Sequence, residues 1–380
     1  MDFKLTKTQM LQQELFRKFA ETEVKPIAKD MDEKEEYSAE LLQKLQKIGA
    51  FGIPYSREYG GQGADVLTYT LCMEEMSKVD ASTGITLSVH TSLCCPCINE
   101  FGTEEQKQKY LVPLAKGEKL GAFGLTEPSA GTDASMQQTT AVLDGDEYVL
   151  NGTKVFITNA GYADTYVIIA MTDKSKGTRG ISAFIVEKDT PGFSIGKKER
   201  KMGIRGSATC ELIFENCRIP KENLLGKEGQ GFKIAMQTLD GGRIGVASQA
   251  LGLAEGAIDE CVKYVMERKQ FGKKIGQMQN TQFELADMAA KVEAAKLLVY
   301  EAACTKDAHG AYSHLAAMAK YLAGATASDV TRRCVQLFGG YGYTRDYPIE
   351  RMMRDAKITE IYEGTAEVQK IVISNWMKLK

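Results

Sequence analysis

The sequence predicts an α+β protein with three successive domains: an N-terminal α-helical domain, a middle antiparallel β-barrel domain and a C-terminal four-helix bundle. The prediction depends on where the apolar period changes along the 380 residues. Residues 1–120 and 229–380 carry apolar side chains at helical spacing, whereas residues 121–228 contain short β-prone runs between turn dipeptides. The length is sufficient for two or three domains around a large shared core.

In the N-terminal domain, two segments have the form of a helix capping box. Thr6-Lys7-Thr8-Gln9 precedes four apolar residues at helical spacing, which are Leu11, Leu15, Phe16 and Phe19. Thr103-Glu104-Glu105-Gln106 repeats the start signal, and helical patterns cover Leu67–Met76 and Asp80–Leu93. We therefore expect helices to begin after Thr6 and after Thr103.

Two dipeptides in the middle domain, Asp144-Gly145 and Asn151-Gly152, are typical of hairpin turns. The strands that we expect around and after them are Tyr148–Leu150, Lys154–Thr158, Thr165–Met171, Ile181–Val186 and Cys210–Phe214. Their spacing predicts a small, mainly antiparallel barrel or sandwich.

Three apolar stripes with the helical period run along the C-terminal domain. Their members are Ile244, Ala247, Leu251, Ala254, Ile258, Cys261 and Val265, then Met288, Val292, Ala295, Val299 and Ala302, and finally Leu315, Met318, Leu322 and Ala325. Long antiparallel helices bury such stripes against one another, as in a four-helix bundle.

Charge and hydropathy argue against several classes of function. The chain has 48 basic and 50 acidic residues and a net charge of −2, so we expect no nucleic-acid-binding surface. No stretch approaches the apolar length of a membrane span, and Met1–Thr6 has neither an apolar signal core nor an Arg-rich transit character. We expect a cytoplasmic protein, or a mitochondrial matrix protein if the chain is a processed eukaryotic form.

The nine cysteines are an odd number and are scattered, which is typical of reduced thiols in a cytosolic protein. One cluster, His90 with Cys94, Cys95 and Cys97, has the residue types of a zinc site. No second ligand pair lies near it in the sequence, and adjacent Cys94 and Cys95 do not easily face one ion. We therefore expect small buried thiols and no metal site.

The segment with the clearest catalytic potential is Ile361–Thr365. It follows an apolar run and precedes the helical pattern of Val368–Met377, so Glu363 is expected in a short turn. Gly364 permits close approach to the backbone, and Thr365 is a good N-cap for the next helix. A carboxylate aimed into a cleft removes a proton from carbon if burial raises its pKa. Taken alone, the segment also fits a surface glutamate in a turn.

Two segments of the middle domain have the residue types that hold a flat, polar-edged cofactor. Phe123–Asp133 contains small residues whose backbone N–H groups can face a ligand, and Thr126 and Thr132 add hydroxyls. In Phe156-Ile157-Thr158-Asn159, an aromatic ring and a hydroxyl lie on one side of a strand. A plain turn and a half-buried strand face are the alternatives.

Two charged segments are expected at the ends of a long helix. Leu239–Arg243 is expected to open it, where an aspartate and an arginine can orient a polar ligand. Arg268–Gly272 is expected at its end, with Gln279 beyond, and Arg268 suits a pyrophosphate. Solvated charges at a Gly-rich helix start and a C-capping basic cluster are the alternatives.

Two glycine-rich segments do not fit known phosphate-binding motifs. Gln336–Tyr343 follows a helix rather than a strand, so it does not match the dinucleotide-binding fingerprint of a Rossmann fold. A helix end packed near a ligand fits the segment better. Gly226–Gly231 lacks the Gly-Lys-Ser/Thr ending of a P-loop, and we interpret it as a loop.

In this order and spacing, the segments resemble the acyl-CoA dehydrogenase family over essentially the whole chain. The most specific are Phe123–Asp133 and Ile361–Thr365, and the likeness is greatest to short-chain, butyryl-CoA-type members, notably bacterial ones. The resemblance implies the family's three-domain fold, non-covalent FAD and a homotetramer. It also implies oxidation of a short-chain acyl-CoA to the trans-2-enoyl-CoA, with electrons exchanged with an electron-transferring flavoprotein.

The resemblance assigns Glu363 as the base that takes the α-proton, while its backbone N–H and a ribityl hydroxyl hold the thioester oxygen and hydride leaves to flavin N5. The residues it assigns to FAD are Phe123, Leu125, Thr126, Thr132, Phe156, Ile157, Thr158, Arg268, Gln270, Phe271, Gln279, Gln336, Leu337, Gly339, Gly340, Thr365 and Glu367. Those it assigns to acyl-CoA are Thr132, Asp240, Gly241, Gly242, Arg243 and Gly364. In the family, Arg268, Gln279 and Gln336–Gly340 serve FAD across a subunit interface.

Two departures and two alternatives remain. Phe156 stands where medium-chain relatives have tryptophan, and Cys94–Cys97 is unusual beside the helix that lines the acyl pocket, so the preferred chain length stays open. A related flavoprotein that binds nucleic acid or a partner without turnover should show a basic extension or a replaced base. Here Glu363 is present and the net charge is slightly acidic, which disfavours that alternative. An acyl-CoA oxidase, which reacts with oxygen, is usually much longer and has an extra C-terminal domain.

Overall fold

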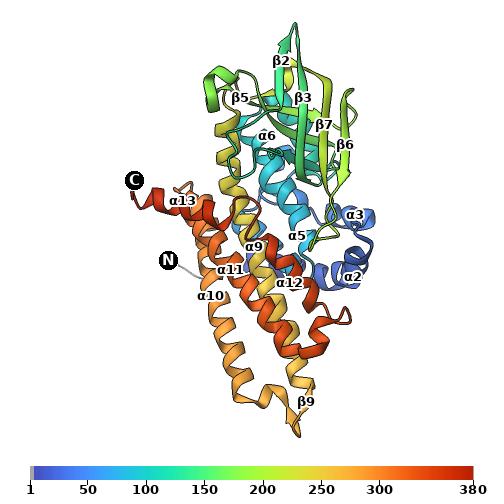
Figure 1. Ribbon diagram of the computed structural model, residues 1–380, viewed down its shortest axis with the longest axis vertical. Helices are drawn as coiled ribbons and strands as arrows, with labels where there is room; N and C mark the ends of the chain where they lie inside the picture. The colour runs from blue at the N-terminus through green and yellow to red at the C-terminus, as the bar shows by residue number, and fades with distance from the viewer. Residues whose placement is uncertain (1–3, 380) are drawn as a thin grey trace.

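The computed structural model describes residues 4–379 and shows an elongated molecule with the sheet at one end (Figure 1). Long C-terminal helices run from the sheet to the opposite end, and the N-terminal helices pack beside both. Met1, Asp2 and Phe3, which belong to the segment analysed above for targeting signals, lie outside the described residues. Across residues 4–379, no helix combines the length and apolar character that crossing a bilayer requires.

The N-terminal region is helical, as predicted. Its α-helices are α1 (Lys7–Phe19), α2 (Lys25–Lys34), α3 (Ala39–Lys47), α4 (Val66–Val79), α5 (Ala81–Ser88), α6 (Cys95–Phe101), α7 (Glu104–Gln106) and α8 (Val112–Ala115). Both predicted capping boxes form. The hydroxyls of Thr6 and Thr103 accept hydrogen bonds from the backbone N–H groups of Gln9 and Gln106, whose side chains accept in return from the backbone N–H groups of the two threonines.

The middle region forms an eight-stranded sheet. Its strands are β1 (Gly121–Gly124), β2 (Thr140–Asp144), β3 (Glu147–Thr158), β4 (Thr165–Met171), β5 (Ile181–Glu187), β6 (Phe193–Lys198), β7 (Thr209–Pro220) and β8 (Leu224–Leu225). They pair in the order β6-β7-β3-β2-β4-β5-β8, and β1 pairs with β4 in parallel. The predicted closed barrel is wrong, because β6 and β8 end this order without pairing with each other. Strand β8 is only two residues long, and both of its residues pair with β5, so it extends the sheet very little.

One of the two predicted hairpin turns is wrong. Asp144-Gly145 does join β2 to β3, with Asp144 paired to Glu147 and Gly145 at φ 65°. Asn151-Gly152 lies inside β3, where the pairing register with β7 shifts between Leu150 and Gly152. Gly152 has φ 143°, and a Cβ there would lie 2.6 Å from the hydroxyl of Thr139. The glycine therefore marks a bulge that lets two strands approach closely.

The C-terminal region is helical, as predicted. Its α-helices are α9 (Gly231–Glu267), α10 (Gln279–Asp307), α11 (Ser313–Phe338), α12 (Ile349–Ile358) and α13 (Ala366–Trp376), and a short hairpin of β9 (Lys269–Gln270) and β10 (Lys273–Lys274) joins α9 to α10. The expectation that Leu239–Arg243 opens the long helix is wrong, because α9 begins at Gly231. The segment lies within α9, so neighbouring side chains, and not open solvent, surround its backbone.

The apolar stripe predicted on α11 is also displaced. Leu315, Met318 and Leu322 are only partly buried and Ala325 is exposed. The buried face consists mainly of Ala316, Ala319, Ala323, Ala327, Val330 and Cys334. Small side chains allow α11 to pack closely on α9, so the short residues form the buried face and the larger ones lie beside it.

Candidate active site

Glu363 lies on the wall of a cavity of about 340 Å3. The lining comes from α5 and the π-helical turn η4 (Val89–Cys94), the segment after β1, the end of β3, the first turns of α9, and the turn between α12 and α13. The sequence-predicted residues that line it are Phe123, Leu125, Thr126, Thr132, Phe156, Ile157, Thr158, Arg243, Glu363 and Gly364. The fold therefore gathers predicted residues from distant parts of the chain around one space.

The turn that carries Glu363 has an unusual backbone conformation. Glu363 adopts φ 52° and Gly364 adopts φ 96°, so a non-glycine residue occupies the left-handed region. The hydroxyl of Thr365 accepts a hydrogen bond from the N–H of Val368, which confirms the predicted N-cap of α13. This geometry directs the Glu363 side chain back toward α9.

The Glu363 carboxylate is shielded from water although the residue as a whole is half-buried. Both of its oxygens are buried, and no described residue makes a hydrogen bond to either of them. Burial raises the pKa of Glu363 to about 7, and the cations of Lys320 and Arg243 oppose that rise. At neutral pH a substantial fraction of the carboxyl is thus ionised and still basic.

Gly242 makes room for this carboxylate on α9. A Cβ at Gly242 would lie 2.0 Å from Oε2 of Glu363 and 2.7 Å from Cδ2 of Leu93. Beside it, the buried Arg243 donates to Asp240 at 2.5 Å, and Nε of Arg243 has no partner among the described residues. Thus the glycine is required by contact with the proposed base, and the arginine adds a positive charge next to it.

The part of the wall that the middle region contributes combines an aromatic ring with free hydroxyls. Phe156 has φ 60° and is 63% exposed, at a register shift that interrupts the pairing of β3 with β7. Because of this irregularity Phe156, Ile157 and Thr158 all line the cavity, which strict strand alternation would not allow. The hydroxyls of Thr126, Thr132 and Thr158 bind no described residue.

Other predicted cofactor residues lie in a second hollow of about 540 Å3. Arg268, Gln270, Leu337, Gly339 and Gly340 line it, and the guanidinium of Arg268 lies 5.4 Å from the ring centre of Tyr341. Arg243 and Arg268 lie on the same helix, α9 and its C-cap, and are separated by roughly 37 Å at 1.5 Å per residue. That length exceeds an extended dinucleotide, so one chain does not bring the two groups of residues together.

The remaining predicted residues line neither space. Phe271 is 93% exposed, and Gln279, Gln336 and Glu367 are also exposed. Thr365 serves as the helix cap described above. Asp240 and Gly241 lie one turn or less from Gly242, and a Cβ at Gly241 would lie 2.7 Å from Nζ of Lys306.

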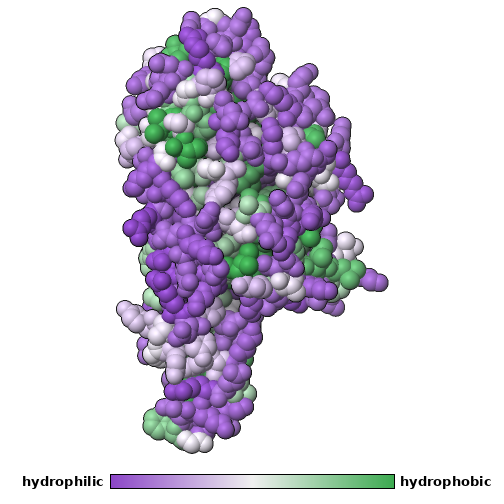
Figure 2. Space-filling model, turned by 90° about the vertical axis from the view of Figure 1, so that its right-hand side faces the viewer, coloured by the Kyte–Doolittle hydropathy of each residue, from purple (hydrophilic) through white to green (hydrophobic). Residues whose placement is uncertain are grey.

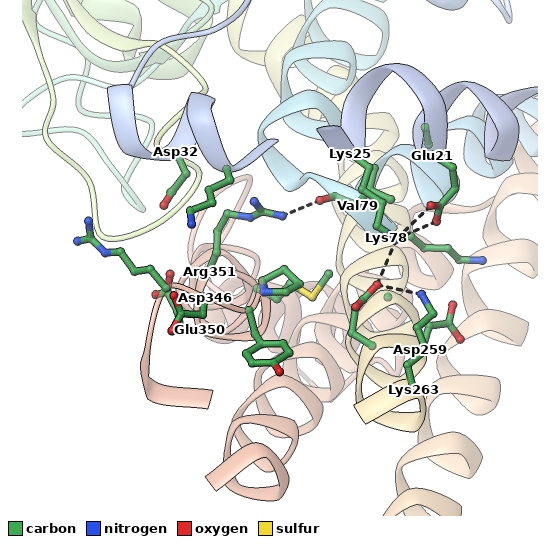
Figure 3. Close-up of a pocket in the computed structure, with 18 of the residues that line it drawn as sticks. Glu21, Lys25, Asp32, Lys78, Val79, Asp259, Lys263, Asp346, Glu350 and Arg351 are labelled. Atoms are coloured by element: carbon green, nitrogen blue, oxygen red, sulfur yellow. Dashed lines mark hydrogen bonds and ion pairs between the residues drawn. The ribbon is translucent and has the colours of Figure 1, made fainter. Parts of the chain in front are cut away.

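A third hollow, of about 480 Å3, lies between the N-terminal helices, α4, α9 and α12 (Figure 3). Its charged side chains largely satisfy one another: Lys25 pairs with Glu21 and Glu260, and Lys263 with Glu260. Arg351 donates to the backbone carbonyl of Val79. Burial raises the pKa of Asp259, which also lines this hollow and forms no ion pair with the described residues. None of the predicted site residues lines it, so the Glu363 cavity is the better candidate.

The His90 cluster is engaged in structural contacts. Nδ1 of His90 accepts from the backbone N–H of Gly121 at 3.0 Å, and Nε2 lies 3.1 Å from the carbonyl of Leu114. Cys94, Cys95 and Cys97 are fully buried thiols. Nδ1 therefore helps to join the N-terminal helices to β1, and Nε2 joins η4 to α8.

Comparison with known proteins agrees with this geometry. Three family models match the chain: acyl-CoA dehydrogenase, N-terminal domain, over residues 6–118; middle domain, over 122–217; and C-terminal domain, over 229–378. The chain belongs to the acyl-CoA dehydrogenase family. Its helical, β-sheet and helical regions are those of the acyl-CoA dehydrogenase fold.

Three members of the acyl-CoA dehydrogenase family are similar to this chain over nearly their whole lengths. A short-chain specific acyl-CoA dehydrogenase of Clostridium acetobutylicum is 62% identical over 374 residues, covering 98% of this chain and 99% of the relative. The structure of butyryl-CoA dehydrogenase from Megasphaera elsdenii has a TM-score of 0.98 at 54% identity and 100% coverage of both chains. A chain from work on the electron transferring flavoprotein of Acidaminococcus fermentans has a TM-score of 0.98 at 60% identity, covering 99% of both chains.

The sequence did not lead us to predict two buried lysines, Lys154 and Lys320, that bind the backbone of the site's segments. Lys154 is fully buried and its Nζ donates to Leu125 O at 3.1 Å and to Glu127 at 2.6 Å, which holds the segment after β1. Lys320 donates to the carbonyl of Gly364 at 2.6 Å. The sequence offered one signal for their burial: each lysine has apolar neighbours on its helix or strand.

Proposed function

We propose that this chain catalyses FAD-dependent α,β-dehydrogenation of a short-chain, butyryl-like acyl-CoA to the trans-2-enoyl-CoA, with Glu363 as the base for the α-proton. The observation that carries the proposal is the buried, unpartnered carboxylate of Glu363 at the cavity wall. Its raised pKa matches proton abstraction near neutral pH. The similarity to short-chain specific relatives supports the substrate class.

The cavity wall fits a flavin. The exposed ring of Phe156 offers a flat apolar face, and the unpartnered hydroxyls of Thr126 and Thr158 offer hydrogen bonds at a polar edge. Bound there, FAD supplies the acceptor for the hydride that leaves the β-carbon. Phe123, Leu125 and Ile157 complete the wall on which the ring system rests.

The protein's own contribution is to polarise the thioester and to hold the proton. The backbone N–H of Glu363 donates to no described acceptor, so it is free to bind the thioester oxygen. The carboxylate takes the α-proton and keeps it in a site from which water is excluded. Arg243 favours the ionised form of the base before the reaction.

Arg268, Gln270, Phe271, Gln279, Gln336, Leu337, Gly339 and Gly340 are proposed to bind the diphosphate and adenosine of an FAD held by a second copy of the chain. The length of α9 between Arg243 and Arg268 supports this arrangement, since one chain cannot use both ends on one cofactor. Figure 2 shows a mainly hydrophilic face with apolar atoms at the lower tip, the end at which Figure 1 places the β9–β10 hairpin and its 93% exposed Phe271. An exposed aromatic ring suits contact with another subunit in a homotetramer.

We further propose that electrons pass to an electron-transferring flavoprotein, which the likeness to the Acidaminococcus fermentans chain supports. The acyl-CoA contacts at Thr132, Asp240, Gly241, Gly242, Arg243 and Gly364, and the FAD contacts at Thr365 and Glu367, remain predictions. So do the four-helix bundle, the domain boundaries after residues 120 and 228, and the cytoplasmic location.

The test is anaerobic addition of butyryl-CoA to the purified protein, which we expect to be yellow. Butyryl-CoA should bleach the flavin absorbance, and Glu363→Gln should keep FAD and acyl-CoA while nearly abolishing bleaching. A colourless protein that FAD does not reconstitute would refute the assignment of the cofactor. A yellow protein that no acyl-CoA bleaches would favour a binding flavoprotein without turnover, and unchanged bleaching in Glu363→Gln would move the base elsewhere, with Glu360 the next candidate.

A further inference from the structure

A buried lysine lies behind the turn that carries Glu363. Lys320, in the middle of α11, is 1% exposed, and its Nζ donates to the carbonyl of Gly364 at 2.6 Å. Its neighbours on the buried face of α11 are Ala316, Ala319 and Ala323. A lysine in a row of buried alanines contradicts the local apolar pattern, and such contradictions concentrate at functional sites.

The contact is made where the backbone needs support. Glu363 and Gly364 both have positive φ, and the side-chain amide of Gln369 is a second donor to the same carbonyl at 2.8 Å. The amide also lies 3.3 Å from the carbonyl of Glu363. Two buried donors from α11 and α13 thus hold the strained turn in place, and the direction of the Glu363 side chain depends on that turn.

Lys320 is also the cation with the largest electrostatic effect on Glu363, and it lacks a counterion of its own. It forms no ion pair with the described residues, whereas Arg243 pairs with Asp240 and Lys154 pairs with Glu127. The charged groups that act on Lys320 are Glu363, Arg243, Glu360 and Glu367, in that order. An unpaired buried ammonium is costly, so its strongest electrostatic partner, Glu363, is the group that its charge serves.

We propose that Lys320 is a positioning residue for Glu363: its ammonium holds the Gly364 carbonyl, and its charge stabilises the ionised carboxylate before proton abstraction. This inference rests on the proposed function, since it assumes that Glu363 is the base. It adds a third element, α11, to the parts of the chain that determine when the base is active.

The order of the two titrations makes this role possible. Burial lowers the pKa of Lys320 to about 8, whereas burial raises the pKa of Glu363 to about 7. The ammonium therefore remains charged while Glu363 loses its proton. The other groups that face Glu363 are Arg243 on α9, and the neutral phenols of Tyr69 on α4 and Tyr362 in its own turn.

The experiment compares Lys320→Met, which removes the charge and the donor, with Lys320→Arg, which keeps both. Anaerobic flavin reduction by butyryl-CoA is measured from pH 5 to 10, roughly two units beyond the pKa values of Glu363 and Lys320. In Lys320→Met the pH midpoint should rise by about one unit, and the rate at pH 7 should fall about fivefold through the smaller ionised fraction alone. Lys320→Arg should restore the midpoint. Lys357→Met, which removes an exposed lysine on α12 that pairs with Glu360, is the matched control and should leave the midpoint unchanged.

A second readout does not use turnover. The infrared carboxylic-acid band that disappears in Glu363→Gln reports the protonation of Glu363 directly, and its titration should move upward in Lys320→Met by the same amount. An unchanged midpoint and an unchanged band in folded, FAD-bound Lys320→Met would overturn the role of Lys320. That result leaves the proposed function intact as long as Glu363→Gln is inactive, whereas active Glu363→Gln would overturn the proposed function itself. If Lys320→Met does not fold, Lys320→Gln keeps a donor without the charge and decides the matter by the same two readouts.

Discussion

Gly242→Ala is a small change that should act on the base through contact alone. The added Cβ would lie 2.0 Å from Oε2 of Glu363, and ordinary van der Waals contact begins at 3.4 Å, so the oxygen must move by about 1.4 Å. A displacement of about 1 Å at a reacting group lowers a rate by roughly 100-fold. We therefore expect flavin reduction by butyryl-CoA to slow by about two orders of magnitude, measured in an anaerobic stopped-flow instrument. FAD binding should persist, because Gly242 is not among the residues that line the cavity with Phe156.

The neighbouring glycine provides the matched control. In Gly241→Ala the Cβ would meet only the flexible end of Lys306 at 2.7 Å, which can move aside. Alanine is favoured over glycine inside a helix by about 1 kcal/mol, so both variants gain the same intrinsic helix stability. Since Gly241 is itself a proposed acyl-CoA contact, the rates are compared at saturating butyryl-CoA, where we expect Gly241→Ala to lose less than tenfold. Equal rates in the two variants, or a wild-type rate in Gly242→Ala, would refute the placement of the carboxylate against α9.

Two further predictions concern stability. Because burial raises the pKa of Glu363 to about 7, the folded protein holds a proton that the unfolded chain releases above about pH 4.5. Glu363→Gln should therefore raise the thermal unfolding midpoint at pH 8 by the equivalent of roughly 2–3 kcal/mol, and by much less at pH 5. An equal gain at both pH values would contradict a buried carboxyl. Lys154→Met leaves the buried Glu127 without its counterion, so it should destabilise the fold by about 3 kcal/mol, measured by urea unfolding, and weaken FAD retention. The double variant Lys154→Met, Glu127→Gln should recover most of this loss, and no recovery would contradict the ion pair.

The sequence was sufficient for features that depend on local patterns. Helix starts at Thr6 and Thr103, the turn at Asp144-Gly145 and the cap at Thr365 each depend on a side chain and its nearest backbone neighbours. Those interactions are complete within a few residues. A single sequence therefore contains all the information that they need.

The failures share a dependence on distant partners. The Asn151-Gly152 dipeptide satisfies the rule for a hairpin, but β7 and Thr139 approach from elsewhere and make the glycine a bulge. The buried face of α11 is made of alanines because α9 packs closely, and apolar size alone pointed to the neighbouring positions. Barrel closure likewise depends on whether β6 and β8, which end the strand order, pair with each other, and the alternation within a strand does not show that.

The candidate site shows the same division in another form. Its lining could be predicted from segments with recognisable chemistry. Lys154 and Lys320 instead support that lining through the backbone carbonyls of Leu125 and Gly364, and Lys154 also binds Glu127 and Gln137. A lysine in a helix or strand pattern is ordinarily a solvated surface residue. Only the fold shows that these two are buried.

Departures from local rules offer a way to locate the site without knowing its chemistry. Positive φ at a non-glycine residue stores strain, and of the nine such residues among 4–379, three are predicted site residues: Phe156, Phe271 and Glu363. Glu363 is supported by Lys320, itself a charge in an apolar row, and is accommodated by Gly242, the residue without a side chain that would strike it. The departure at Glu363 costs stability, and donors on α11 and α13 hold the turn that carries it. These contacts keep one carboxylate on the wall of the cavity that the aromatic ring of Phe156 also lines, and proton abstraction beside a flat acceptor requires both groups at one site.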